Sequence, residues 1–307
     1  MGIYYRDYAD FLARHFKGKV QKLTVNAGFS CPNRDGTLGR GGCVYCNNTS
    51  FSPSLGGGTV TAQLEAGKRF FERKYPQMRY VAYFQSYTNT HGEISRLLSL
   101  YEEALQVDKV DGLIIGTRPD CIPYGLLGEL ATIGKPVLME YGAETSHDAT
   151  LAAINRCHTW GQTVDAVERT VAAGLPVGLH LIMGLPGETV AMMLQTICRV
   201  AALPVDTVKL HQLQIIKGTA LAGEAERDAV SGSLSFRGLP VKEFTVDEYI
   251  DLCVEIIKAI SELNPGMAIE RFTSQAPDAL LVSPRWGLKN YQFTNLLHNR
   301  LKATWRL

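Results

Sequence analysis

Six short apolar segments, separated by segments of helical periodicity, constrain the fold of this 307-residue chain more than any other feature. The apolar segments are residues 22–28, 79–85, 112–117, 136–142, 176–184 and 206–216. Apolar residues recur at helical spacing between them, in residues 61–75, 93–106, 123–133, 164–173 and 188–201. Because a parallel strand is reached only through a crossover, usually a helix, this alternation predicts a parallel sheet. We therefore expect an α/β fold of six βα units, either an open sheet or a partial (β/α)6 barrel.

The partial barrel is favoured because the C-terminal edge of barrel strands brings the following loops together at one mouth. After about residue 217 the alternation stops, and a loop rich in glycine and charge follows. Thr245 and Glu248 then have the spacing of a capping box, which predicts a helix that ends near Leu263. We expect residues 1–218 to form the core with an N-terminal extension, and residues 219–307 to form a small helical C-terminal extension packed on the barrel.

The composition excludes two classes of protein. With 46% hydrophobic residues and a net charge of +1, the chain is not intrinsically disordered, and seven cysteines are too few for a disulfide miniprotein. No stretch approaches the about 20 consecutive apolar residues of a membrane helix, and the N-terminus lacks the apolar run of a signal sequence. We expect a soluble, cytoplasmic protein with no membrane partner. Cys198 and Cys253, spaced with apolar residues, are expected in the core.

Three cysteines follow the first strand candidate. Eleven residues separate Cys31 from Cys43, and two residues separate Cys43 from Cys46, within a glycine-rich loop that can fold around a compact group. Thiolates are soft ligands, which select zinc or an iron-sulfur cluster. A zinc site would need a fourth ligand from elsewhere in the fold, such as His91 or Cys121, whereas three thiolates on a 4Fe-4S cluster leave one iron open. Uncoordinated cysteines are a further alternative.

The CxxC pair with Tyr45 inside it, the upstream cysteine and the βα series that follows resemble the radical S-adenosylmethionine (radical SAM) superfamily. The usual spacing there is CxxxCxxC, and this chain departs from it by its longer first gap. Residues 29–46 resemble the YhcC/YtqA group, in the branch that includes Elongator-type catalytic subunits. Residues 116–122, 154–159, 180–189 and 208–218 match the same group in order.

This resemblance implies a 4Fe-4S cluster on Cys31, Cys43 and Cys46 whose open iron binds S-adenosylmethionine and cleaves it reductively to a 5′-deoxyadenosyl radical. It implies further cofactor contacts from Tyr45 beside the adenine and from Gln85 and Ser86 near the methionine amino group. Glu144 and Arg156, twelve residues apart, correspond to residues that relatives place on the ribose and the carboxylate. The alternative for Arg156 is a solvated charge at a helix end.

Strand alternation provides a separate indication of inward-facing polar groups. Glu140, His180, Lys209 and His211 share the parity of apolar neighbours, so each is expected to point into the barrel. We predict that Glu140, Lys209 and His211 are catalytic and that His180 binds cofactor. The alternative, compatible with the first, is that Glu140 pairs with Lys209 or a histidine in a buried network.

The two ends of the chain carry basic residues that could bind RNA. In the tail these are Arg285, Lys289, Arg300, Lys302 and Arg306. They are interleaved with Trp286, Tyr291, Phe293 and Trp305. A second basic run consists of Arg14, Lys17, Lys19 and Lys22. The alternative is a solvated helix whose aromatic residues pack on the barrel.

The resemblance points to tRNA as substrate, with the C5 substituent of the wobble uridine as the target, and to an electron donor such as flavodoxin or ferredoxin. A small-molecule or protein substrate is the alternative for an enzyme of this class. A zinc-stabilised RNA-binding module and an iron-sulfur electron carrier are the alternatives without this chemistry.

Overall fold

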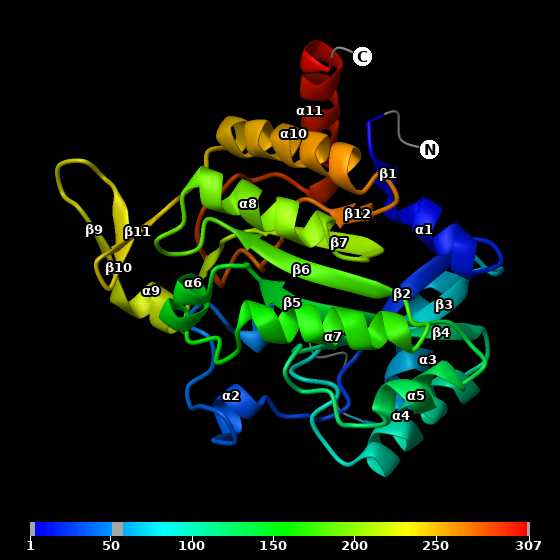
Figure 1. Ribbon diagram of the computed structural model, residues 1–307. Helices are drawn as coiled ribbons and strands as arrows, with labels where there is room; N and C mark the ends of the chain where they lie inside the picture. Colours follow the sequence, from blue (N-terminus) through cyan, green and yellow to red (C-terminus); the bar gives the residue numbers. More distant parts are fainter. Residues whose placement is uncertain (1–3, 51–57, 306–307) are drawn as a thin grey trace.

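The computed structural model describes residues 4–50 and 58–305 (Figure 1). Its main sheet has eight strands in the order β1-β12-β7-β6-β5-β4-β3-β2, and every neighbouring pair is parallel. The expected strands are present as β2 (Val20–Val25), β3 (Arg79–Phe84), β4 (Val110–Thr117), β5 (Val137–Glu144), β6 (Val177–Met183) and β7 (Thr207–Gln212). The prediction of a parallel α/β fold with six βα units is therefore confirmed.

Two further strands extend this sheet beyond β7. They are β12 (Ala268–Arg271) and β1 (Arg6–Asp7), which are too short to show a recognisable alternation in sequence. The Lys22 Nζ atom on β2 lies 2.8 Å from a carboxylate oxygen of Glu270 on β12, although these strands lie near opposite ends of the strand order. The sheet is therefore curled into a partial barrel, as predicted. Its concave inner side is called the lumen below.

Helices cover the convex side of the sheet. They are α3 (Val60–Glu72), α4 (Ile94–Gln106), α5 (Leu126–Ala131), α6 (Asp148–Ala153), α7 (Trp160–Ala172) and α8 (Val190–Ala201). Each longer helix buries one face: α8, for example, buries Met193, Ile197 and Val200 at i, i+4 and i+7 in the main core. The five predicted helical segments are confirmed, and α6 is an additional short helix.

The N-terminal end of the lumen is closed by α1 (Tyr8–His15). Phe11 on this helix packs in one cluster with Tyr83, Ile114 and Leu138, which are lumen-side residues of three strands. Because this end is filled with apolar side chains, only the C-terminal ends of the strands leave the lumen open.

The last third of the chain forms α10 (Val246–Leu263) and α11 (Asn290–Thr304), and Figure 1 shows α10 lying along α8. The predicted capping box of Thr245 and Glu248 is present. A small antiparallel sheet stands out from the body; its strands are β9 (Ala225–Arg227), β10 (Leu234–Phe236) and β11 (Leu239–Val241).

The remaining elements of this part are α9 (Ala220–Glu224) and the antiparallel pair of β8 (Ile215–Ile216) and β13 (Leu281–Ser283). The division at residue 218 stays a prediction, and β12 joins the later segment to the main sheet. In the part of the chain that the structure describes, no helix is long and apolar enough to cross a membrane.

Candidate active site

A cavity of about 200 Å³ lies at the C-terminal ends of the strands. The sequence-predicted site residues that line it are Cys31, Cys43, Tyr45, Cys46, Gln85, Glu140, Glu144, Arg156, His180 and His211. The two that do not are Ser86, which is buried after β3, and Lys209, which is buried beneath the wall. Strands far apart in sequence thus bring most of the predicted residues to one place.

The cysteines are held in a tight loop after β2. Cys31 precedes the short helix α2 (Pro32–Asp35), and the backbone then turns at Gly42, where φ is +80°. A Cβ atom at Gly42 would lie 2.7 Å from Arg34 Nε, so a larger residue cannot occupy this position without displacing that side chain. Asn155 Nδ2 donates to the Gly42 carbonyl at 2.8 Å. The segment after β5 therefore holds the cysteine loop in position.

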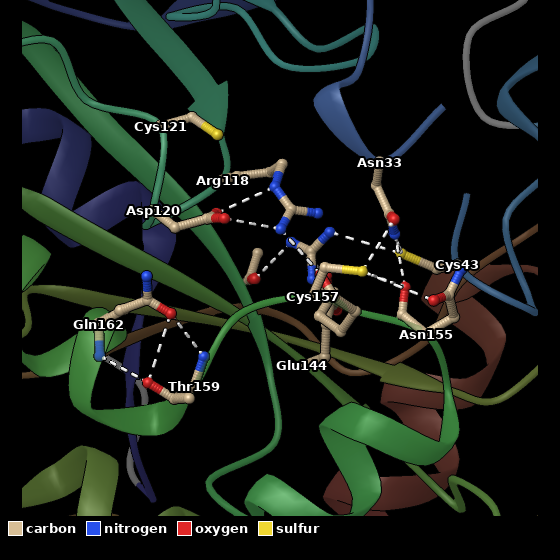
Figure 2. Close-up of polar contacts among 12 residues, drawn as sticks. Asn33, Cys43, Arg118, Asp120, Cys121, Glu144, Asn155, Cys157, Thr159 and Gln162 are labelled. Carbon is tan, nitrogen blue, oxygen red and sulfur yellow. Dashed lines mark hydrogen bonds and ion pairs between the residues drawn. The ribbon is translucent and has the colours of Figure 1, made fainter. Parts of the chain in front are cut away.

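Two side chains donate hydrogen bonds to the Cys43 sulfur. Asn33 Nδ2 and Arg156 Nη1 each lie 3.6 Å from Cys43 Sγ. Figure 2 shows the side chains of Asn33 and Cys157 pointing toward each other beside Cys43, and the Cys157 thiol donates to Asn33 Oδ1 at 3.0 Å. Donors around a sulfur stabilise its thiolate form, which is the form that binds a metal. The surroundings of Cys43 therefore fit a cluster ligand.

Two buried arginines contribute to the cavity wall. Arg156 Nη2 lies 3.3 Å from Glu144 Oε1, and Arg118 forms a double hydrogen bond with Asp120 at 2.8 and 2.9 Å (Figure 2). Arg156 is only 7% exposed, so the alternative of a solvated helix-end charge is wrong. Arg156 Nε and Arg118 Nη1 are buried without a hydrogen-bond partner in the described part of the chain. These unused cationic donors suit an anionic group, such as the carboxylate of S-adenosylmethionine.

Strained backbone also gathers around the cavity. Tyr87 and Glu144, which line it, have φ values of 62° and 65°. Asn155 and Cys157, on either side of Arg156, have φ values of 54° and 58°. Such conformations cost about 1 to 3 kcal/mol each and cluster at functional sites.

Glu140 is the centre of a buried ionic network below the cavity. Its carboxylate accepts from Lys209 Nζ at 3.0 Å, from His180 Nε2 at 2.8 Å and from Lys22 Nζ at 3.4 Å. Burial alone would raise the pKa of Glu140, but Lys209, Lys22 and His180 together hold that pKa well below its usual range. Lys209 also contacts Glu270 at 3.0 Å. The buried network foreseen as an alternative is therefore present, while the catalytic role of Glu140, Lys209 and His211 stays a prediction.

The two proposed sources of a fourth zinc ligand do not reach the cysteines. His91 Nε2 lies 3.1 Å from Asp35 Oδ2, and neither His91 nor Cys121 lines the cavity. Within residues 4–50 and 58–305, no group of three or more His, Cys, Asp or Glu side chains is placed to hold a single metal ion. Ligands of zinc must meet at one ion, whereas the thiolates on a 4Fe-4S cluster bind different irons.

The predicted RNA-binding tail is contradicted in several details. Arg300 is bound to Asp247 and Asp251 on α10, so its charge is already paired. Trp286 stacks on Phe293, which is fully buried, because the aromatic residues fill the space between α10 and α11. The alternative of a helix packed on the barrel is therefore right for these residues. Arg306 lies outside the described residues.

The second basic run is also not an RNA-binding surface at the mouth. Lys22 lies in the lumen, bound to Glu140 and Glu270. Arg14, Lys17 and Lys19 precede β2 and therefore lie at the end of the sheet opposite to the cysteine loop.

The prediction that Cys198 and Cys253 lie in the core is half right. Cys253 is buried, but Cys198 is exposed because it lies on the outer face of α8.

Several residues of the site were missed in the sequence, including Arg118, Tyr87, Lys22 and Arg271. Arg118 and Tyr87 follow the ends of β4 and β3, where residues of a parallel sheet gather, and this position was the available signal. Lys22 shares the lumen-facing parity of its strand but was assigned to a surface run. Arg271 lines the cavity from a four-residue strand that carries no detectable pattern.

Comparison with known proteins gives the family. A profile of the Radical SAM superfamily matches residues 31–198, and one of the Radical_SAM C-terminal domain matches residues 205–303. YhcC of Escherichia coli (strain K12) is 38% identical over 279 residues, covering 90% of this chain and 85% of YhcC. YtqA of Bacillus subtilis (strain 168) is 33% identical over 295 residues, covering 95% of this chain and 87% of YtqA.

The chain is also similar, over a shorter segment, to the tRNA uridine(34) acetyltransferase of Methanocaldococcus jannaschii. The two sequences are 29% identical over 131 residues, which cover 40% of this chain and 24% of that protein. Among solved structures, Elp3 of Methanocaldococcus infernus, with an N-terminal deletion, has a similar fold. The TM-score is 0.63 at 18% identity, covering 92% of this chain and 63% of that one. The cofactors are a 4Fe-4S cluster and S-adenosylmethionine, which the donor set of the cavity fits. From its profile matches and its relatives, this chain belongs to the radical SAM superfamily, in the YhcC group.

Proposed function

We propose that this radical SAM enzyme modifies a base of tRNA, and that its target is the C5 substituent of the wobble uridine. The observation that carries the proposal is the sequence match to a tRNA uridine(34) acetyltransferase, which extends over 131 residues of this chain. The matched segment is part of a longer protein, so the acetyl-transfer activity in its name is not transferred to this chain. We infer that the two proteins share the binding of a uridine at the site where the radical forms.

Exposed aromatic side chains in the loops after β3 and β4 support a nucleic-acid substrate. Tyr87 lines the cavity and is 41% exposed, and Tyr124, in the loop after β4, is 97% exposed. Moving a base out of its stack costs a free energy of a few kcal/mol, and stacking on aromatic side chains can offset this cost. We infer that these tyrosines, rather than the aromatic residues of the tail, receive the bases of the anticodon loop.

We further infer how the chain holds its cofactors. Cys31, Cys43 and Cys46 would bind the cluster, and Arg156 would bind the carboxylate of S-adenosylmethionine, with Glu144 accepting from its ribose hydroxyls. When bound, the two cofactors supply the one-electron chemistry that removes a hydrogen atom from the substrate. A reductant is required, and we propose a flavodoxin or ferredoxin.

Tyr45, Gln85, Ser86 and His180 complete the proposed cofactor contacts. Tyr45 and Gln85 line the cavity, in agreement with contacts to the adenine and the methionine amino group. Ser86 lies beneath the wall, so we infer that it orients Gln85 rather than touching the cofactor itself.

Of the proposed catalytic residues, Glu140 and His211 line the cavity, whereas Lys209 does not. His211 lines the cavity beside His180 and is the group we propose to exchange a proton with the substrate. Among the described residues, Lys209 contacts Glu140, Glu270 and Tyr83 and does not line the cavity, so we propose it as a positioning residue that keeps Glu140 ionised.

The test is anaerobic reconstitution of the cluster, followed by measurement of 5′-deoxyadenosine in the presence of bulk tRNA or of an unrelated structured RNA. We expect tRNA alone to stimulate cleavage of S-adenosylmethionine, and mass spectrometry of the digested tRNA to show a changed uridine nucleoside. Arg156→Ala should lose binding of S-adenosylmethionine while it retains the cluster spectrum. If cleavage proceeds but neither RNA stimulates it or is changed, the substrate is a small molecule or a protein.

A further inference from the structure

An irregularity in β12 turns two neighbouring charged residues toward the lumen. Adjacent side chains of a regular strand point to opposite faces of the sheet. The register of β12 on β7 shifts between Ile269 and Arg271, and such a bulge re-aims the side chains around it. Glu270 consequently bonds to Lys22 inside the lumen, at 2.8 Å, while Arg271 lines the cavity.

The charges in the lumen are not balanced. In the group of charges around Glu140, the cations are Lys22, Lys209 and Arg271, and the carboxylates are Glu140 and Glu270. Both lysines contact both carboxylates within 3.4 Å. Arg271 forms no ion pair with any residue in the described ranges, and its Nε is buried without a hydrogen-bond partner there. The positive charge of Arg271 therefore faces the cavity without a carboxylate among the described residues.

The histidines beside Arg271 are held in defined tautomers. Burial, together with nearby positive charge, lowers the pKa of both His180 and His211, so both rings are neutral. Arg271 can only donate, and its Nη2 lies 2.6 Å from His211 Nε2, so that nitrogen accepts. The proton of His211 is then on Nδ1. His180 donates its Nε2 proton to Glu140, which leaves its own Nδ1 as an acceptor.

We propose that Arg271 and His211 form a binding site for an anionic group of the substrate, a carboxylate or a phosphate. A guanidinium donates paired hydrogen bonds to either group, and the neutral imidazole adds a donor beside it. The identity of the molecule that bears this anionic group rests on the proposed function. In tRNA the anion is either a backbone phosphate or an acidic substituent of a modified base.

The test compares anionic probes with their neutral parent nucleoside. The reconstituted holoenzyme with S-adenosylmethionine is dialysed anaerobically against uridine, uridine 5′-monophosphate or 5-carboxymethyluridine. We expect an anionic probe to bind about tenfold or more tightly than uridine, the usual effect of a charge-assisted hydrogen bond. Preference for the monophosphate assigns the site to a backbone phosphate, and preference for the carboxymethyl compound assigns it to a base substituent.

The variants connect this preference to the proposed residue. Arg271→Gln should abolish it, Arg271→Lys should keep part of it, and Arg69→Gln, an exposed arginine on α3, should leave it unchanged. The proposal is overturned if Arg271→Gln retains the preference, or if the parent shows no preference either with these probes or with the second series described next. It is also overturned if Arg271→Gln weakens only S-adenosylmethionine, because the guanidinium would then bind that cofactor.

A second series without uridine separates this proposal from the proposed function. Phenyl phosphate and phenylacetate are compared with neutral benzyl alcohol. If only this series shows a preference that depends on Arg271, the anion site stands and uridine is the wrong substrate. If tRNA is modified while neither series shows such a preference, the proposed function stands and the anion site is overturned.

Discussion

Among single residues, the cysteines differ sharply in what surrounds them. Cys43 is buried and receives hydrogen bonds from Asn33 and Arg156, whereas Cys198 is exposed on α8 and does not line the cavity. The difference follows from position, because Cys43 lies in a loop held by hydrogen bonds from the segment after β5, whereas Cys198 lies on the outer face of a helix. Only the first has the donors that stabilise a thiolate in contact with a cluster.

This contrast gives a prediction for the cluster. Cys43→Ala removes one of three thiolates, so the reconstituted variant should lose most of its iron and its brown chromophore. Cys198→Ala is the matched control and should retain both. Iron and sulfide analysis with the visible spectrum measures the outcome. A Cys43→Ala protein with full iron content would contradict the assignment of the ligands.

His158 makes stability depend on pH. Burial, reinforced by the charges of Arg156 and Arg118, lowers its pKa to about 2. The folded protein therefore binds fewer protons at this position than the unfolded chain, whose histidine has a pKa of about 6.5. The free energy of unfolding should thus fall as the pH drops below about 6.5, by up to about 1.4 kcal/mol per pH unit.

Urea unfolding of the parent and of His158→Gln between pH 7 and pH 5 isolates this contribution. The variant should lose the part of the pH slope that His158 causes. His91→Gln, at a side chain that is 28% exposed, serves as the control. Equal slopes in parent and His158→Gln would show that folding does not lower the pKa of this imidazole.

At the level of elements, the start of α10 is defined by its own side chains. This helix packs between α8 and α11, and its first turn is closed by a reciprocal pair of hydrogen bonds between Thr245 and Glu248. Lys242 lies 2.6 Å from the Glu248 carboxylate and holds the pKa of that group low, at about 2, so the capping acceptor stays ionised at neutral pH. The local sequence thus specifies where α10 begins.

Removing this cap should reduce stability by a predictable amount. Thr245→Ala is expected to lower the free energy of unfolding by about 1 kcal/mol, the usual cost of losing an N-cap hydroxyl. Thr294→Ala, whose hydroxyl bonds only to a carbonyl within α11, should change stability by less than about 0.5 kcal/mol. Chemical denaturation compares the two. A larger loss at Thr294 would mean that its hydroxyl contributes more to stability than the capping hydroxyl of Thr245.

In the molecule as a whole, Lys22 connects distant parts of the curled sheet. It extends from β2 to Glu140 on β5 and to Glu270 on β12, with its side chain only 18% exposed. Removing one partner from a buried ionic network leaves the others uncompensated, which typically costs about 3 to 5 kcal/mol. Lys22→Ala should therefore destabilise the barrel strongly and open the lumen.

An exposed ion pair provides the comparison for Lys22. Lys258 and Glu255 lie 2.7 Å apart on α10 with side chains 41% and 53% exposed, so Lys258→Ala should change stability by no more than about 0.5 kcal/mol. Thermal or urea unfolding of both variants gives the difference. If Lys22→Ala costs no more than Lys258→Ala, the network does not hold the barrel closed.

The sequence by itself determined the features that are encoded locally. The βα alternation, the capping box at Thr245 and the cysteine loop all depend on residues within one or two turns or strands, so their patterns are visible in the chain. Strand parity also placed Glu140, His180 and His211 on the lumen side, since alternation within a strand fixes its two faces.

Only the tertiary structure decided which distant segments meet. The addition of β12 and β1, the entry of Lys22 and Arg271 into the lumen, and the pairing of Arg300 with α10 all join residues more than 45 positions apart. A four-residue strand and a single charged side chain have no periodicity from which their partners can be read. Their positions follow from the curl of the sheet and the packing of helices on it, which are properties of the whole fold.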